Sequence, residues 1–264
     1  MVVLGISGLY HDSAAAVVKD GEIIAAAQEE RFTRVKHDKS IPYNAIDFCL
    51  AEVGCQMWEL DAVVFYDQPL LTLDRYTKNV LSLGEDSGYE IEAYLDDVVF
   101  SRLSIDRHLR RKYNKLGKEG KLLVIEHHIS HAASAFYPSP FEEAAILTID
   151  GVGEWASLTI GHGRGKSIEM QEEIDYPNSL GLLYSAFTAF CGFKVNSGDY
   201  KFMGLAPYGE PIYYDLIKDR LIDIKDDGSF SINLEYFDYY RGKYMTNDRF
   251  SELFGGVRGR EKAA

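Results

Sequence analysis

The stretch from Leu122 to Ser157, LLVIEHHISHAASAFYPSPFEEAAILTIDGVGEWAS, decides the fold of this chain. A short apolar run leads to His127 and His131, and a second apolar run ends at Asp150 before a glycine-rich turn. Residues four apart on a helix lie on one face, so both imidazoles can reach a single ion. Imidazole suits Zn, Fe, Ni and Cu, and α/β folds place ligands at the ends of strands. The stretch therefore predicts a metal held by His127, His131 and Asp150.

A histidine pair at this spacing also arises by chance, and chance pairing remains the alternative at this point. The zinc-protease motif requires Glu directly after the first histidine, as the general base. His128 occupies that position here, so a metalloprotease is disfavoured.

Composition and charge limit the function classes. The hydrophobic fraction of 46% and the charged fraction of 26% are those of an ordinary soluble globular protein. A net charge of −13 argues against direct binding of nucleic acid, because phosphate backbones require a basic face. The three cysteines fit no zinc or redox spacing. No apolar run is long enough to span a membrane and no secretory signal precedes the first strand, so we expect a cytoplasmic protein.

The first 28 residues predict three strands, over 2–8, 14–19 and 22–28, with a hairpin turn at Asp20-Gly21. The same pattern returns after 143 residues: Ile6-Ser7-Gly8 aligns with Ile149-Asp150-Gly151, and Gln28-Glu29-Glu30 with Gln171-Glu172-Glu173. Two matches at one offset indicate an internal duplication, in which each strand–strand–strand (βββ) unit begins a lobe. A cleft between the lobes, with a polar turn from each facing inward, would suit a phosphorylated ligand.

Other elements follow from turn and capping signals. We expect a helix over 43–53 ending at Gly54, a strand over 61–66, and a helical insertion at about 67–120 with helical spacing from Ile91 to Lys115. A helix over 180–191 should begin with Ser179 as its N-cap, and residues 197–209 are expected to form a rigid glycine-containing loop. The segment from Glu30 to Lys39 carries four cations and a histidine, which suits either a solvated loop or an anion-binding edge.

Three segments together carry a family resemblance: GISGLYHDSAAAVVKDGEIIAAAQEERFTRVKHD, HHISHAASAFYPSPFEEAAILTIDGVGEWAS and SGDYKFMGLAPYG. They resemble the NodU/CmcH O-carbamoyltransferases of antibiotic and nodulation-factor synthesis. Asp199 departs from the family motif, where Glu is expected. The resemblance implies an α/β fold of the ASKHA (actin/hexokinase/Hsp70-like) superfamily, related to the Kae1/TsaD proteins. Residues 1–144 would form the first lobe and 145–264 the start of a second, incomplete lobe, without the YrdC-like domain of the family.

The resemblance also implies roles for particular residues. His127, His131 and Asp150 would hold a divalent metal, Fe or Zn, and His11, oriented by Asp12, would be the catalytic base. The two phosphate loops would be Ser7–Ser13 and Asp150–Ser157. The residues expected to bind the nucleotide or its phosphates are Ser7, Gly8, Ser13, Lys36, Gly151, Gly153, Gly198 and Lys201.

The implied reaction is transfer of a carbamoyl group from carbamoyl-adenylate, made from ATP and carbamoyl phosphate, to a hydroxyl of a small-molecule or sugar acceptor. Such an enzyme is an EC 2.1.3-type carbamoyltransferase, and this chain alone is not expected to be fully active without its YrdC-like domain or subunit. The alternatives are a Kae1/TsaD-like partner in tRNA threonylcarbamoylation, an ASKHA sugar kinase or ATPase, and a non-catalytic binding module. The sequence names neither the acceptor nor the metal, and a homo-oligomer is left open.

Overall fold

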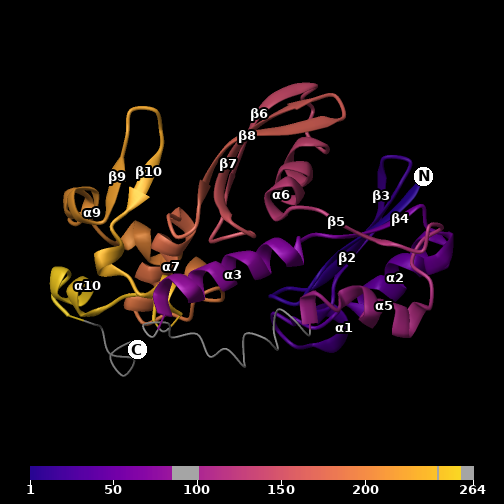
Figure 1. Cartoon of the computed structure of the whole chain (residues 1–264), viewed down its shortest axis with the longest axis horizontal. Helices are drawn as coiled ribbons and strands as arrows, with labels where there is room; N and C mark the ends of the chain where they lie inside the picture. Colours follow the sequence, from indigo (N-terminus) through magenta and orange to yellow (C-terminus); the bar gives the residue numbers. More distant parts are fainter. Residues whose placement is uncertain (85–100, 243, 257–264) are drawn as a thin grey trace. The chain divides into compact units, whose positions relative to one another are not determined.

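A computed structural model describes residues 1–84, 101–242 and 244–256 (Figure 1). The chain divides into two compact units. Unit 1 contains residues 1–74 and, of the described residues, 101–130; unit 2 contains residues 75–84 and 131–256. The division between the units falls inside the helices α3 (Pro69–Leu83) and α6 (His127–Phe136). The lobe boundary predicted at residue 144 was placed at the start of the second βββ unit instead.

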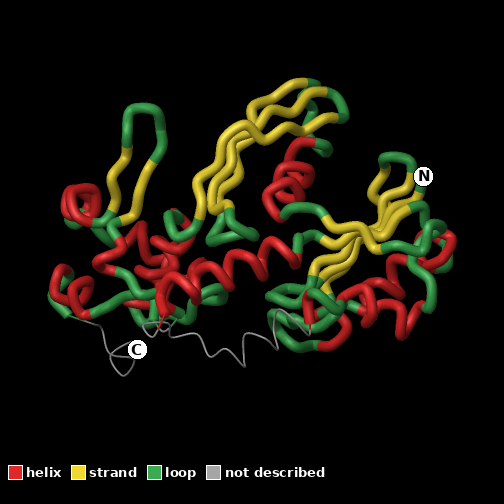
Figure 2. Tube along the Cα trace, viewed as in Figure 1, coloured by secondary structure: helices red, strands yellow, loops and turns green. Residues whose placement is uncertain are grey.

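Unit 1 is built on a five-stranded mixed sheet in the order β3-β2-β1-β4-β5 (Figure 2). β1, β2 and β3 are antiparallel, and β4 and β5 continue the sheet in parallel with β1. The β2–β3 turn has positive φ at both central residues, 53° at Asp20 and 93° at Gly21, as a tight hairpin requires. The five strands are β1 (Val2–Ser7), β2 (Ala14–Lys19), β3 (Glu22–Gln28), β4 (Ala62–Phe65) and β5 (Leu122–Val124).

One face of this sheet is covered by helices. α2 (Tyr43–Val53) packs its apolar stripe against the face that carries Leu4 and Val17, and α5 (Ile105–Tyr113) joins the same core. The buried Glu29, just before the short helix α1 (Glu30–Thr33), accepts hydrogen bonds from the backbone N–H groups of Asn44 and Ala45 at 3.1 and 2.8 Å. These are orphan donors of the first turn of α2, so a distant carboxylate caps this helix.

Unit 2 begins with a three-stranded antiparallel sheet of β6 (Glu143–Ile149), β7 (Ala156–Arg164) and β8 (Ser167–Asp175). The pairing of its first two strands repeats that of unit 1 at the offset of 143: Ile6 faces Ala15, and Ile149 faces Leu158. α6 covers one face of this sheet (Figure 1). A Cβ added at Gly163 would lie 2.7 Å from the Phe136 ring, so this glycine permits the close approach.

The rest of unit 2 forms an aromatic core around α7 (Leu180–Phe190), in which Phe187 and Phe190 contact Phe250 at ring-centroid distances of 5.1 Å. The other helices and strands of this part are α8 (Asp199–Leu205), α9 (Tyr214–Arg220), β9 (Ile222–Ile224), β10 (Phe230–Ile232) and α10 (Asp248–Leu253). Short 3-10 turns lie at Ala206–Tyr208, Leu234–Tyr236 and Tyr239–Arg241 in this part, and at Met57–Glu59 in unit 1.

The α/β class and both βββ units are confirmed. The predicted loop over 197–209 is wrong, because Asp199–Leu205 is helical and a 3-10 turn follows it. The predicted insertion contains the helices α3 and α5, but residues 114–120 form bends and turns. Residues 91–100 of the expected helical spacing lie outside the described residues. None of the described helices combines the length and apolarity needed to cross a membrane.

Candidate metal centre and neighbouring turn

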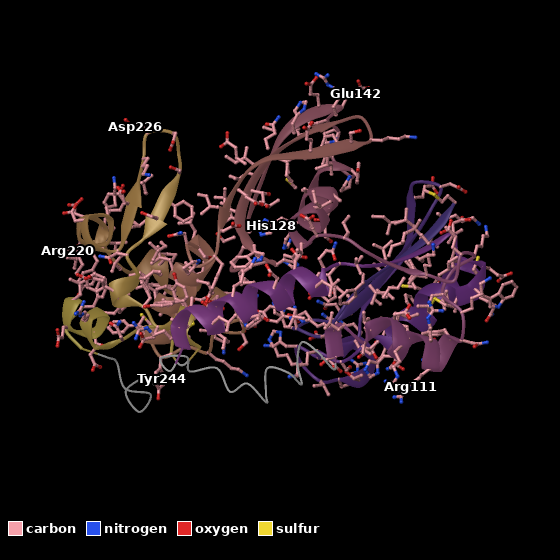
Figure 3. All side chains as sticks on the ribbon, in the orientation of Figure 1. Arg111, His128, Glu142, Arg220, Asp226 and Tyr244 are labelled. Carbon is pink, nitrogen blue, oxygen red and sulfur yellow. The ribbon has the colours of Figure 1, made fainter. Side chains whose placement is uncertain are left out.

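α6 and the end of β6 bring the three predicted metal ligands together. Nitrogen atoms of His127 and His131 and a carboxylate oxygen of Asp150 all lie within 4.8 Å of one another. The two histidines are one turn apart on a continuous helix, and His131 Nε2 lies 3.3 Å from Asp150 Oδ2. The His127 ring packs edge-on against Tyr66, with centroids 5.4 Å apart. His128 is buried at the start of the same helix (Figure 3) and is not part of this group.

The backbone around Asp150 is held by the start of α7. Ser179 is fully buried, and its hydroxyl lies 3.1 Å from the Asp150 carbonyl and 2.6 Å from the Gly151 carbonyl. The same oxygen accepts the Leu182 N–H at 3.0 Å and so caps the helix. A Cβ on Gly181 would lie 2.5 Å from the Asp150 carbonyl oxygen. Only glycine lets the first turn of α7 approach the Asp150 backbone so closely.

The Asp150 side chain is oriented by its own turn. Its Oδ1 accepts the Gly151 N–H at 2.6 Å, which leaves Oδ2 on the side of His131. The Gly153 N–H donates to the Ala156 carbonyl at 2.9 Å. Both amides that were predicted to bind phosphate therefore have partners within the turn, and a phosphate would have to replace those hydrogen bonds.

In unit 1, the turn after β1 forms a second polar cluster. His11 Nδ1 lies 2.9 Å from Asp12 Oδ2, and His37 Nδ1 lies 3.0 Å from Asp12 Oδ1. The His37 backbone N–H donates to Glu30 Oε2 at 2.9 Å. Asp12, Glu30 and His37 form a second group of residues that could hold a metal ion, with one potential ligand atom from each side chain within 4.8 Å of the others.

The two histidines change the acidity of Asp12. Its partial burial alone would raise the pKa, but the hydrogen bonds from His37 and His11, together with the charge interactions with both rings, outweigh this effect. The net result is a pKa of Asp12 below its usual value of 3.8. Asp12 is thus held as a carboxylate, which can only accept hydrogen bonds.

The remaining predicted binding residues are distributed over both units. In unit 1, Ser7 ends β1, the buried Ser13 begins the return to β2, and Lys36 is exposed beside His37. Gly8 lies close to Ser13, since an added Cβ there would be 3.3 Å from the Ser13 hydroxyl. In unit 2, Gly198 precedes α8, and the Lys201 ammonium lies 6.0 Å from the centroid of the Tyr200 ring.

Sequence reasoning missed the residues that position these groups. Ser179 was predicted only as a helix cap, and Gly181 and His37 were given no role. The adjacent Ser179-Leu180-Gly181, a cap followed by a glycine inside a helix, was the available signal for close approach. Nothing in the spacing of His11, Asp12 and His37 indicated that one carboxylate would join two imidazoles 26 positions apart in the chain.

The structure is that of an α/β protein with two βββ units and a cluster of two histidines and one carboxylate. The chain matches the family described as "Carbamoyltransferase N-terminus" over residues 2–264, and it belongs to that family.

Relatives agree with this assignment. The chain is 52% identical over 261 residues to the uncharacterized protein sll1178 of Synechocystis sp., an overlap of 97% of this chain and 42% of the relative. It is 31% identical over 225 residues to the nodulation protein NolNO of Sinorhizobium fredii, covering 85% of this chain and 32% of that protein. The chain thus spans less than half the length of either relative. Among solved structures, YeaZ from Pseudomonas aeruginosa matches with a TM-score of 0.37 and 14% identity, over 67% of each chain.

Proposed function

We propose that this chain takes part in the transfer of a carbamoyl group from carbamoyl-adenylate to a hydroxyl of a small-molecule or sugar acceptor. Membership of the carbamoyltransferase family and the likeness to NolNO support the reaction class. The observation that carries the proposal is the approach of His127, His131 and Asp150 to within 4.8 Å. The chain covers 42% of sll1178, so the reaction is assigned to the complete protein, in which a YrdC-like domain or subunit would make carbamoyl-adenylate from ATP and carbamoyl phosphate.

The ligand set fits a divalent metal. Two imidazoles and a carboxylate suit Fe or Zn, and the Gly151 N–H and Ser179 fix the carboxylate through its own turn, as supporting contacts do in metal sites. A cation bound by these residues would polarise the carbamoyl oxygen and offset the charge of the adenylate phosphate.

His11 is proposed as the base. Because ionised Asp12 only accepts hydrogen bonds, His11 Nδ1 must carry a proton in their 2.9 Å contact. This tautomer leaves Nε2 of the neutral ring free to accept a proton. The acceptor hydroxyl would give its proton to Nε2 while its oxygen bonds to the carbamoyl carbon. The bond from that carbon to the phosphate oxygen breaks, and AMP leaves with the electron pair.

Each unit by itself is proposed to offer polar and cationic groups to a phosphate of the nucleotide. In unit 1 these are Ser7, Gly8, Ser13 and Lys36, and in unit 2 they are Gly151, Gly153, Gly198 and Lys201. The exposed lysines supply positive charge in a chain whose net charge is −13, which suits a nucleotide better than a nucleic acid. The enzyme is proposed to act in the cytoplasm.

The test uses the complete protein, supplied with ATP, carbamoyl phosphate and hydroxyl acceptors such as aminoglycosides and oligosaccharides, with products identified by mass. We expect a carbamoylated product, loss of bound metal in His127→Ala by elemental analysis, and a fall in turnover of about 10²- to 10⁴-fold in His11→Ala. His162→Ala, which changes an imidazole paired with Glu143 at 2.9 Å on the β6–β7 strands, is the control and should change neither quantity. A phosphorylated product, or full metal content in His127→Ala, would contradict the proposal.

A further inference from the structure

The turn that carries His11 is hydrogen-bonded through its backbone to residues 38–39, a segment of unit 1 that is distant in sequence. The Leu9 N–H donates to the Lys39 carbonyl at 2.9 Å, and the Ser13 N–H donates to the Asp38 carbonyl at 2.8 Å. Asp38 is itself fixed, because its carboxylate accepts the Thr33 hydroxyl at 2.6 Å and the Ser40 N–H at 2.9 Å. These contacts place the side chain of His37 against the turn.

We infer that His37 is a positioning residue that orients His11 by holding the second oxygen of Asp12. The inference depends on the proposed function for the catalytic role of His11. His37 Nδ1 lies 3.0 Å from Oδ1, and His11 Nδ1 lies 2.9 Å from Oδ2. Each oxygen accepts one N–H, so the carboxylate cannot rotate without losing a charge-assisted hydrogen bond. A fixed carboxylate in turn fixes the tautomer and the ring plane of His11.

The surroundings of His37 suit a fixed, neutral donor. Its Nε2 is buried and has no hydrogen-bond partner among the described residues. A proton on Nε2 would bury an unpaired donor, which costs free energy. The neutral ring with its proton on Nδ1 has an acceptor instead of a donor at the buried Nε2, and it supplies the N–H that Asp12 needs. Among the described ionisable groups, Asp12 hydrogen-bonds to the His37 ring and Glu30 accepts the His37 backbone N–H. A Glu30 carboxylate oxygen also lies within 4.8 Å of a nitrogen of the His37 ring.

The backbone at this position supports the same assignment. His37 has φ of 57° and Asp12 has φ of 50°, a left-handed conformation that is uncommon outside glycine but enriched for Asn, Asp and His. The backbone N–H of His37 is used to hold that conformation through Glu30. Both partners are thus kept in unusual backbone geometry that directs their side chains at each other.

Two substitutions compatible with a positive φ separate positioning from folding. Glycine adopts this backbone without strain, so His37→Gly removes the imidazole alone, whereas His37→Asn keeps an N–H donor near the place of Nδ1. Arg34→Gly is the matched control, because exposed Arg34 also has a positive φ, 62°, and lies three positions away. All three variants are compared with the wild type by thermal unfolding.

The first readout is the tautomer of His11, measured by nitrogen-15 NMR of the imidazoles without any substrate. We expect His11 to hold its proton on Nδ1 in the wild type, in Arg34→Gly and in His37→Asn, and to lose that preference in His37→Gly. The second readout is turnover in the complete protein, where His37→Gly should lower kcat on the order of 10- to 100-fold with little change in KM. His37→Asn should restore most of the lost rate.

A His11 tautomer that is the same in His37→Gly and Arg34→Gly would overturn the inference, as would a loss in His37→Asn equal to that in His37→Gly. The NMR result does not depend on carbamoyl transfer. If the wild type transfers no carbamoyl group but the tautomer still responds to His37, the proposed function fails and the positioning role stands.

Discussion

The two βββ units share one pattern of strand pairing but bury opposite faces of their sheets. In unit 1 the face that carries Leu4 and Ile6 is covered by helices, and these side chains are 0% and 2% exposed. Their counterparts at the offset of 143 are Leu147 and Ile149, which are 60% and 51% exposed. Equal register therefore does not imply equal packing, and the helices that follow the strands determine which face becomes core.

The opposite face shows the reverse arrangement. In unit 2 it is covered by α6 and carries the buried Thr148 and Thr159, whose hydroxyls are 2.7 Å apart. In unit 1 the corresponding positions are Gly5 and Ala16, and they line an open cavity of about 710 Å³. Small residues leave space on this face of unit 1, whereas bulkier and polar residues fill it in unit 2.

The packing of the helices explains why opposite faces of the two sheets are buried. In unit 1, α2 packs along β2 and β3 through Ile46 and Cys49. In unit 2, α7 contacts its sheet mainly at Leu158 and otherwise joins the aromatic core with Phe237 and Phe250. The apolar surface of α7 is thus committed to the later elements of the chain, which leaves Leu147 and Ile149 exposed.

Truncating the two equivalent leucines gives the largest expected contrast. Leu4→Ala removes a fully buried side chain and should lower the free energy of unfolding by about 2–5 kcal/mol. Leu147→Ala removes a side chain that is 60% exposed and should change it by no more than about 0.5 kcal/mol. Urea denaturation of both variants measures the difference. Similar losses in the two variants would show that the face of β6 is buried in solution, and the contrast between the units would then be abandoned.

The strands and the helix that carries His127 and His131 were predictable because their signals are local. Short apolar runs separated by turns predicted β1 to β3, and Gly54 marked the end of α2 with φ of 70°. The spacing of His127 and His131 placed both on one face of a helix. Such features depend on a few neighbouring residues, so the sequence contains them directly.

The second tripeptide match, of Gln28-Glu29-Glu30 with Gln171-Glu172-Glu173, does not join equivalent positions of the two βββ units. Gln28 ends β3 opposite Ala14, but its counterpart Gln171 lies inside β8, where the register shifts between Met170 opposite Gly161 and Glu172 opposite Ile160. The hairpin of β7 and β8 continues two residues further on each strand than that of β2 and β3, with turns after Arg164 and Lys19. Its pairing is therefore displaced by four residues relative to the repeat. Hairpin length depends on cross-strand contacts that a gapless comparison of sequences does not detect.

Long-range and close-range packing account for the other errors. Glycines, an acid and a lysine interleaved with apolar residues predicted a loop at 197–209. Gly204 nevertheless lies inside α8, with nothing within 4 Å of an added Cβ, so tertiary context overrode local propensity there. The contacts of Ser179 with Asp150 and of His37 with Asp12 join residues at least 25 positions apart. No local pattern encodes those distances.

A second contrast concerns the glycines of two helices in unit 2. Gly181→Ala would place its Cβ 2.5 Å from the Asp150 carbonyl oxygen, so the α7 start or the Asp150 turn must move. We expect a loss of about 1–3 kcal/mol, as for other overpacked sites, together with weaker metal binding. Gly204→Ala meets no neighbouring atom and should stabilise α8 by about 0.5–1 kcal/mol.

Chemical denaturation and metal titration of these two variants provide the check. Unchanged stability and metal affinity in Gly181→Ala would mean that close approach of α7 does not hold the Asp150 turn. In the structure, residues 38–39 hydrogen-bond to the turn after β1, and Ser179 hydrogen-bonds to the turn after β6. That result would remove the parallel between two turns that are each fixed by a segment distant in sequence.

The smallest expected effect is a pH dependence in the turn of unit 1. The net lowering of the Asp12 pKa, in which hydrogen bonds from His37 and His11 overcome the effect of burial, means that the folded state binds this proton less readily than the unfolded state. The stability contributed by the carboxylate is therefore fully present above the unfolded pKa, near 3.8, and is lost as the pH falls through the lower folded value. Asp12→Asn should be less stable than the wild type at neutral pH, and the difference should shrink below pH 3.8.

Unfolding curves of both proteins across this range measure the difference, with Asp226→Asn, a change in the exposed β9–β10 turn, as the control. A difference that stays constant from neutral to acid pH would show that Asp12 acts through the shape of its side chain and its left-handed backbone, not through its charge. The two imidazoles would then orient a residue whose ionisation contributes nothing to holding the turn.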